Sequence, residues 1–242
     1  MTQSKVLILQ HVPWEKPGRI LDSLDDLGMS YEIANVAKEK KPDLPDFKEI
    51  SGVVIMGGPM GALDFDKYPG LKAEGKLARA AVSVGKPVLG VCLGHQIIAT
   101  ALGAKLKSGD APEIGFAPIK RIDKHDFFSM WNKTLDVLHW HNDVVTLPEG
   151  ATPLARSEKT KNQAFRFGSA LGLQFHLEVT PTLLDEWLDE PCMVKDLKAA
   201  GGSKSQLRGA FAEYNPQLQP MADQVFSGFA ARCSTYAATL ER

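Results

Sequence analysis

The stretch KPVLGVCLGHQIIATALGA, residues 86–104, decides the predicted fold because it places a strand directly before a helix. Its apolar run PVLGV predicts a buried strand, and the residues after it are typical of a helix. Cys92 stands at the junction, with Gly90 before it and Gly94 after it. This G-x-C-x-G pattern is the cysteine form of a nucleophile elbow, a sharp turn from strand to helix. The same pattern also fits a small buried thiol between strand-end glycines.

Short apolar runs alternate with helix-like segments through the first half of the chain. Strands separated by helices and apolar along almost their whole length are typical of a parallel sheet that is covered on both faces. The sequence therefore predicts a doubly wound α/β unit with functional loops beyond the carboxyl ends of its strands. The predicted strands are 6–10, 31–36, 52–57 and 87–91, and the predicted helices are 19–27 and 71–84.

The second half of the chain has a different pattern. Shorter β segments with turns between them predict an antiparallel or mixed extension of the sheet at 115–122, 134–140, 152–157, 163–167 and 170–175. After Pro181 the chain reads as helical, with breaks predicted at GGSKS (201–205) and NPQLQP (215–220). We expect one domain over residues 1–242, with a core at 6–179 and a helical part at 181–242.

Composition excludes several classes of function. The 242 residues include 28 basic and 29 acidic side chains, without a basic block, so nucleic acid is not an expected partner. Cys92, Cys192 and Cys233 are widely spaced and form no CxxC motif, which argues against a disulfide framework and indicates a reducing compartment. No apolar run is long enough for a signal peptide or a membrane helix. We therefore expect a cytoplasmic protein with no membrane partner.

The thiol of Cys92 has candidate catalytic partners further along the chain. At the start of a helix, unpaired N–H groups and the helix dipole favour a thiolate and can hold an oxyanion. The segment LGLQFHLEV, residues 171–179, supplies His176 and Glu178 two positions apart at the end of a predicted strand. Residues two apart in an extended chain project to the same side, so Glu178 can orient the imidazole as a base for the thiol.

A glycine-rich loop follows the third predicted strand. In MGGPMG, residues 56–61, the glycines let the backbone approach a substrate, and the N–H of Gly58 can complete an oxyanion hole with that of Leu93. By itself this loop also reads as an ordinary Gly-Pro turn. It lacks the GxxxxGK[ST] spacing, so the sequence does not predict a phosphate-binding loop.

The segment HWHND, residues 139–143, raises the alternative of a metal site. On a strand, His139 and His141 share a face, and with Asp143 or another histidine they could bind zinc. Two histidines two residues apart are a weak ligand signature, and a zinc site would leave the elbow unexplained. We therefore predict no metal and no cofactor.

Taken together, these segments resemble the class I, triad-type glutamine amidotransferases. The resemblance spans about residues 6–179 and implies the family's flavodoxin-like fold. It is strongest to free-standing proteins similar to the glutaminase domain of GMP synthetase, a group that also resembles plant γ-glutamyl peptidases. The motifs that carry it, in the family's order, are GGPMG at 57–61, GVCLGHQ at 90–96, HWHND at 139–143, NQAFRFG at 162–168 and GLQFHLE at 172–178.

The resemblance implies a role for each matching residue. Cys92 would be the nucleophile, His176 the general base and later acid, and Glu178 its orienting carboxylate. The remaining positions are oxyanion donors at Gly58 and Leu93, a contact to the γ-glutamyl group at Gln96, and neighbours of the substrate's α-amino and α-carboxylate groups at Met60, His141, Asn142 and Asp143. In two places the chain departs from the family: Leu177 stands where proline is common, which would loosen the His–Glu pair, and Asn142 replaces a glycine.

These roles imply hydrolysis of the γ-glutamyl amide bond of glutamine or of a γ-glutamyl compound through a cysteine thioester. The released ammonia would pass to a separate synthase subunit, or an amine would be released by a free-standing γ-glutamyl peptidase. The chain has no SGGxDS-like loop after Val179, so we expect that it cannot make GMP alone. A catalytically silent protein that binds or senses a γ-glutamyl metabolite is the alternative. A cysteine α/β hydrolase acting on esters is disfavoured because Glu178 follows the histidine in chain order.

Overall fold

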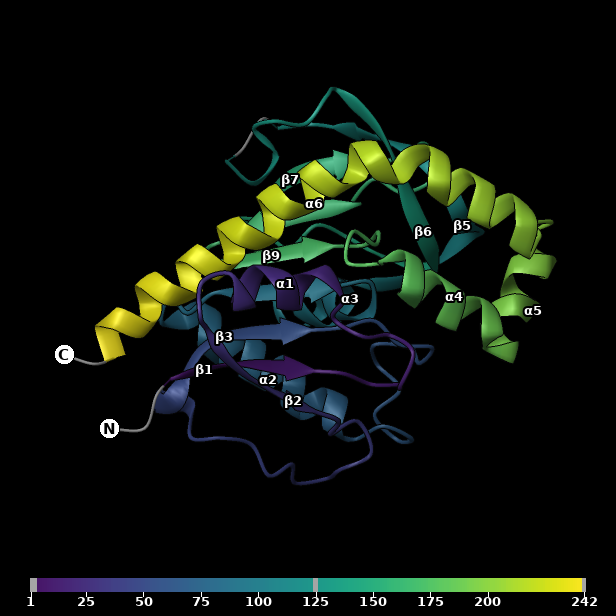
Figure 1. Cartoon of the computed structure of the whole chain (residues 1–242). Helices are drawn as coiled ribbons and strands as arrows, with labels where there is room; N and C mark the ends of the chain where they lie inside the picture. Colours follow the sequence, from purple (N-terminus) through teal and green to yellow (C-terminus); the bar gives the residue numbers. More distant parts are fainter. Residues whose placement is uncertain (1–3, 124–125, 241–242) are drawn as a thin grey trace.

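A computed structural model describes residues 4–123 and 126–240 (Figure 1). Over these residues the strands form one nine-stranded sheet in the order β2-β1-β3-β4-β9-β8-β7-β5-β6. The strands are β1 Lys5–Leu9, β2 Ser30–Ala34, β3 Ile50–Ile55, β4 Val88–Val91, β5 Leu106–Arg121, β6 Thr134–Val145, β7 Thr152–Arg156, β8 Ala164–Phe167 and β9 Ala170–Leu173. The predicted α/β fold is confirmed.

Helices cover both faces of the sheet. In Figure 1, α1 and α6 lie on one face and α2 and α3 on the other, and each of these two pairs is in contact. The helices are α1 Arg19–Asp25, α2 Gly70–Ser83, α3 Leu93–Ala101, α4 Pro181–Asp189, α5 Pro191–Ala199 and α6 Lys204–Leu240, with short 3-10 turns η1 Phe47–Glu49 and η2 Asp126–Phe128. Within the described ranges, no helix is long and apolar enough to cross a membrane.

The parallel half of the sheet brings distant loops together. Strands β2, β1, β3, β4 and β9 pair in parallel, so their carboxyl ends share one edge. Strands β3 and β4 are buried along their whole length, which explains why both read as continuous apolar runs. Figure 1 shows the arrows of β1, β3 and β9 pointing toward the side where α4 and α5 lie. The loops after these strands therefore converge there.

The antiparallel half is more extensive than its sequence pattern indicates. Strand β5 begins at Leu106 rather than at residue 115, and β6 continues to Val145 rather than ending at residue 140. The added part of β5 is polar and mostly exposed, so it has no apolar alternation to predict a strand. It is extended because its backbone pairs with β6, with a register shift between Ser108 and Glu113.

The predicted break at residues 215–220 is wrong. Helix α6 runs through this segment with Pro216 and Pro220 inside it. A proline removes one backbone donor and leaves the carbonyl four residues earlier without its partner. Both prolines, and residues 212 and 216 that carry those carbonyls, are exposed, so water can satisfy the freed oxygens. Leu218 and Phe226 are buried in the core on the opposite side and hold the helix in place. The break predicted at residues 201–205 is present between α5 and α6.

Candidate active site

Cys92 lies on a strained turn between β4 and α3. Its backbone φ is 52°, and it is the one residue other than glycine with a positive φ within 4–123 and 126–240. Non-glycine residues avoid this region, and such strain concentrates at functional sites. Helix α3 begins at Leu93, immediately after the cysteine. The sharp turn predicted from the G-x-C-x-G pattern is therefore present.

The two flanking glycines make the turn sterically possible. A Cβ atom on Gly94 would lie 1.9 Å from the carbonyl oxygen of Ile55, and one on Gly90 would lie 2.5 Å from the backbone of Gly94. Both distances are too short for any side chain. The pattern thus reflects backbone packing that holds the thiol at the end of the strand.

His176 and Glu178 form a buried pair at the end of β9. The Nδ1 atom of His176 lies 2.7 Å from Oε1 of Glu178, and both side chains are almost fully buried. The backbone N–H of His176 donates to the carbonyl of Leu138, and the ring packs edge-on against Trp187 at 4.9 Å. Its Nε2 is buried and has no partner at hydrogen-bond distance among the described residues. Nε2 is therefore the nitrogen available to exchange a proton.

The thiol and the imidazole influence each other's charge. Burial raises the pKa of the Cys92 thiol, while the nearby His176 acts to lower it. Burial lowers the pKa of His176, but Glu178 and Cys92 together raise it well above its usual value. The thiol donates a hydrogen bond to the carbonyl of Trp140 at 3.6 Å.

Leu177 does not loosen the His–Glu pair as the missing proline suggested. The guanidinium of Arg19 donates to the carbonyl of Leu177 at 2.9 Å and also to that of Val179. These carbonyls flank Glu178 on both sides. The other end of the guanidinium donates to Asn215 of α6 at 2.6 Å. Arg19 therefore restrains the backbone around Glu178 through hydrogen bonds from a different helix, whereas a proline would restrain it through its own ring.

A cavity of about 440 Å³ opens over the thiol. Helix α5, whose role sequence reasoning missed, forms one of its walls, and His176 and Glu178 do not line it. The side-chain amide of Gln96 donates to the carbonyl of Asp143 at 3.0 Å, which ties α3 to β6. Besides Cys92, the predicted residues that line the cavity are Gly58, Met60, Leu93, Gln96, His141, Asn142 and Asp143. A second cavity, of about 550 Å³ between α2 and α3, is lined by none of the predicted residues.

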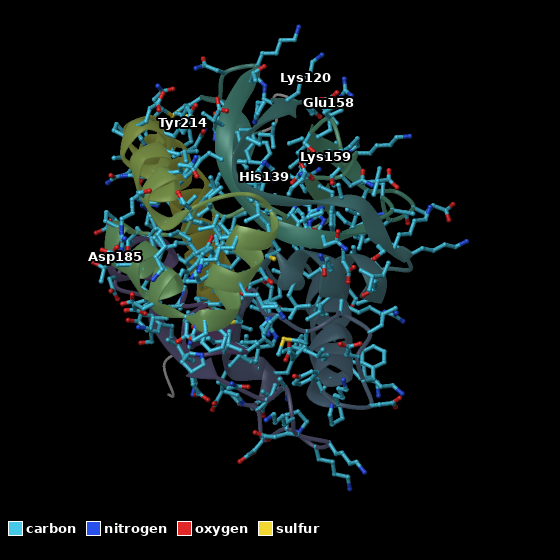
Figure 2. The ribbon with its side chains drawn as sticks, turned by 90° about the vertical axis from the view of Figure 1, so that its right-hand side faces the viewer. Lys120, His139, Glu158, Lys159, Asp185 and Tyr214 are labelled. Carbon is cyan, nitrogen blue, oxygen red and sulfur yellow. The ribbon has the colours of Figure 1, made fainter. Side chains whose placement is uncertain are left out.

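The HWHND segment contributes to a buried polar cluster. Glu113 of β5 joins His139 and His141 of β6, and one ligand atom from each lies within 4.8 Å of the others. Asp143, which the alternative of a zinc site had considered beside the histidines, is outside this cluster. The Glu113 carboxylate accepts hydrogen bonds from Thr160 at 2.5 Å and Gln163 at 2.9 Å, so it is already satisfied by side chains. Figure 2 shows His139 among the strands, away from the helical side marked by Asp185 and Tyr214.

Two residues of the loop after β1 were also missed. His11 is buried against Gly57 and Glu74. Glu15 lines the cavity, and its buried Oε2 has no hydrogen-bond partner within the described ranges. That oxygen lies 1.7 Å from where a Cβ of Gly57 would stand. Burial raises the pKa of Glu15 to about 7, with nearby Glu178 adding to the effect. The rule that loops after parallel strands carry sites would have singled out this segment.

Known proteins share this architecture. The family model of class-I glutamine amidotransferases matches residues 18–193. The glutamine amidotransferase-like protein YfeJ of Salmonella typhimurium is 33% identical over 73% of this chain and 76% of its own length. One of the subunits of the glutamine-hydrolysing GMP synthase of Sulfolobus acidocaldarius is 33% identical over 67% of this chain and 84% of its own length.

Solved structures agree with these relatives. A glutamine amidotransferase from Thermotoga maritima superposes with a TM-score of 0.86 at 31% identity, covering 95% of this chain and 99% of that one. Another from Methylobacillus flagellatus has a TM-score of 0.81 at 25% identity, covering 98% of this chain and 96% of that one. The chain therefore belongs to the class-I glutamine amidotransferase family.

Proposed function

We propose that the chain hydrolyses the γ-glutamyl amide bond of glutamine or a γ-glutamyl compound through a thioester on Cys92. The observation that carries the proposal is the strained Cys92 at the floor of a cavity, with His176 and Glu178 buried behind it. A nucleophile, a base and a group that orients the base are the parts that covalent catalysis requires.

Each step uses a named group. Cys92 passes its proton to Nε2 of His176 as sulfur attacks the γ-carbonyl carbon. The oxyanion that forms accepts hydrogen bonds from the N–H groups of Gly58 and Leu93. His176 then protonates the leaving nitrogen, the C–N bond breaks, and ammonia or an amine departs. His176 next takes a proton from water, which attacks the thioester and releases the γ-carboxylate and the thiol.

The names of the relatives bear on the identity of the leaving group. Several are named as subunits of glutamine-hydrolysing GMP synthases, which supports glutamine as substrate and a separate synthase partner that accepts the ammonia. The cavity extends from Cys92 to α5, which supports room for a larger leaving group and thus a γ-glutamyl peptidase. Glutamine and γ-glutamyl peptides offered together to the isolated protein separate these cases. Rapid peptide turnover with negligible glutaminase activity would rule out the ammonia-donor role.

Mass spectrometry of the stalled enzyme tests the proposed chemistry. Offered a panel of γ-glutamyl amides, the protein should gain a γ-glutamyl group on the peptide that contains Cys92. Cys92→Ala should abolish this adduct and lower kcat by roughly 10⁴-fold or more. Cys192→Ser is the matched control, because Cys192 also lines the cavity and its replacement should leave the adduct in place. Binding of γ-glutamyl compounds without any adduct would instead support the catalytically silent binding protein.

A further inference from the structure

The peptide that joins Gly57 to Gly58 is held from below by a buried histidine. Nδ1 of His11 lies 2.8 Å from the carbonyl oxygen of Gly57, and Nε2 lies 2.9 Å from Oε2 of Glu74 on α2. A carbonyl oxygen only accepts hydrogen bonds, so Nδ1 carries a proton and donates it. The backbone carbonyl of His11 itself accepts from Asn35 at 2.9 Å, which anchors the loop after β1.

Holding this carbonyl also sets the direction of the next N–H. In a trans peptide the C=O of one residue and the N–H of the next point to opposite sides of the chain. His11 holds the Gly57 carbonyl, so the N–H of Gly58 points away from His11. Gly58 lines the cavity beside Cys92, and within 4–123 and 126–240 its N–H has no protein acceptor. It is free to receive a ligand oxygen.

A peptide between two glycines needs such an anchor. Glycine occupies positive and negative φ about equally well, so this peptide can turn over at little cost. If it turned over, the Gly57 carbonyl would face the cavity, where it would repel an oxyanion. The hydrogen bond to His11 opposes that rotation.

We propose that His11 and Glu74 are positioning residues that lock the Gly57–Gly58 peptide with its N–H toward the oxyanion, so that the oxyanion hole is preformed. This inference rests on the proposed function, since it assigns one donor of the same reaction.

The electrostatics of the pair support this role. Burial lowers the pKa of His11, but the hydrogen bond and charge of Glu74, the Gly57 carbonyl and the charge of Glu15 together raise it above its usual value. Both ring nitrogens face acceptors, as an imidazolium requires. A buried ion pair is often no more stabilising than apolar residues of similar volume. A positioning task gives this pair a function that apolar residues lack.

Two covalent probes separate oxyanion stabilisation from general reactivity. A γ-diazoketone analogue of glutamine places its carbonyl in the oxyanion hole before it alkylates Cys92, whereas iodoacetamide needs no such hole. In His11→Ala we expect kcat and the rate of diazoketone inactivation to fall by about 10²-fold, because one oxyanion donor is lost. KM and the iodoacetamide rate should change far less. His11→Asn keeps an N–H near the position of Nδ1 and should recover part of the loss.

His139→Asn is the matched control. His139 is also fully buried and contacts a backbone carbonyl, that of Ala117 at 3.2 Å, but it does not line the cavity. Its ratio of diazoketone to iodoacetamide rates should equal that of the wild type. If His11→Ala does not fold, Glu74→Leu tests the same contact, because it removes the acceptor that fixes the protonation of His11. The ratio must then fall in Glu74→Leu.

Two results would overturn the assignment. One is an equal loss with both probes in His11→Ala, which would indicate a structural role alone. The other is no loss with either probe, which would show that the contact from His11 is not needed to hold the peptide. These results differ from a failure of the proposed function, in which wild-type protein itself would form no thioester.

Discussion

Two buried histidine–glutamate pairs occupy the two halves of the sheet and behave in opposite ways. At the end of the parallel strand β9, His176 and Glu178 lie 2.7 Å apart, and the pKa of His176 is raised well above its usual value. In the antiparallel strands, His141 and Glu113 lie 3.4 Å apart, and burial together with His139 lowers the pKa of His141 to about 3.

The two carboxylates also differ in their other contacts. Oε2 of Glu113 accepts hydrogen bonds from Thr160 and Gln163, and these neutral donors stabilise the charge without help from an imidazolium. Oε2 of Glu178 has no hydrogen-bond partner in the described part of the chain, and its Oε1 lies 2.7 Å from His176. The same two residue types thus have different surroundings and different imidazole pKa values in the two places.

The substitution with the largest expected effect disrupts the pair of His176 and Glu178. Glu178→Gln should lower kcat by roughly 10³-fold, because an amide that donates to Nδ1 selects the tautomer in which Nε2 cannot accept the thiol proton. Since Glu178 raises the pKa of His176, the acid limb of the kcat/KM profile, which reports deprotonation of this base, should also move to lower pH. Steady-state kinetics over a pH series measures both changes.

Glu113→Gln makes the same change in the second pair and is the matched control. We expect a stability loss of about 1–3 kcal/mol from impaired buried hydrogen bonds, with little effect on kcat. Equal losses of kcat in the two variants would show that the pairs do not differ in role.

A smaller effect is expected for Glu15, whose carboxylate lies near His176 and Glu178. Its Oε2 accepts no hydrogen bond within the described ranges. Its pKa is raised from 4.5 to about 7 by burial, so the folded state holds a proton that the unfolded state has lost between these values. Stability therefore falls as pH rises through this window. Glu15→Gln should remove that decline and raise the free energy of unfolding at pH 8 by about 3 kcal/mol.

Urea unfolding at pH 4 and pH 8 measures the effect of Glu15→Gln. The advantage of the variant should be present at pH 8 and largely absent at pH 4. Glu186 of α4 is half-buried and pairs with Lys16, the neighbour of Glu15, and it supplies the control variant Glu186→Gln, which should show neither change. An advantage of equal size at both pH values would contradict the titration of Glu15.

The substitution with the smallest expected effect tests the part of the cavity wall that belongs to β6. Asp143→Asn should raise KM by about tenfold and leave kcat nearly unchanged, because a partly exposed carboxylate contributes modest binding to an ammonium group. The hydrogen bond from Gln96 goes to the backbone of Asp143 and survives the change. A fall in kcat at constant KM would show that this wall takes part in the chemistry itself.

Local features of the sequence predicted much of the site. The elbow could be predicted because Gly90 and Gly94 are needed by backbone packing around Cys92 itself. The His176–Glu178 contact could be predicted because two residues of one extended segment share a side. Their meeting with Cys92 required only that β4 and β9 be parallel neighbours, as they are.

Other features depended on partners far away in the chain. The helix through Pro216 contradicts local propensity, and its apolar contacts with the core hold it. Glu113 joins His139 and His141 because the pairing of β5 with β6 places it opposite His141. Glu15 and His11 carry no motif, and their surroundings come from Gly57 and α2.

By itself, therefore, the sequence determined the alternation of strands and helices in the parallel half, the sharp turn at Cys92 and the contact between His176 and Glu178. These properties depend on spacing within a few residues. The tertiary structure alone decided the charges of the buried groups, the anchor beneath Gly57 and the wall formed by α5. Each of these depends on burial and on hydrogen bonds between segments distant in sequence, because the same ionisable side chain is favoured or penalised according to what surrounds it.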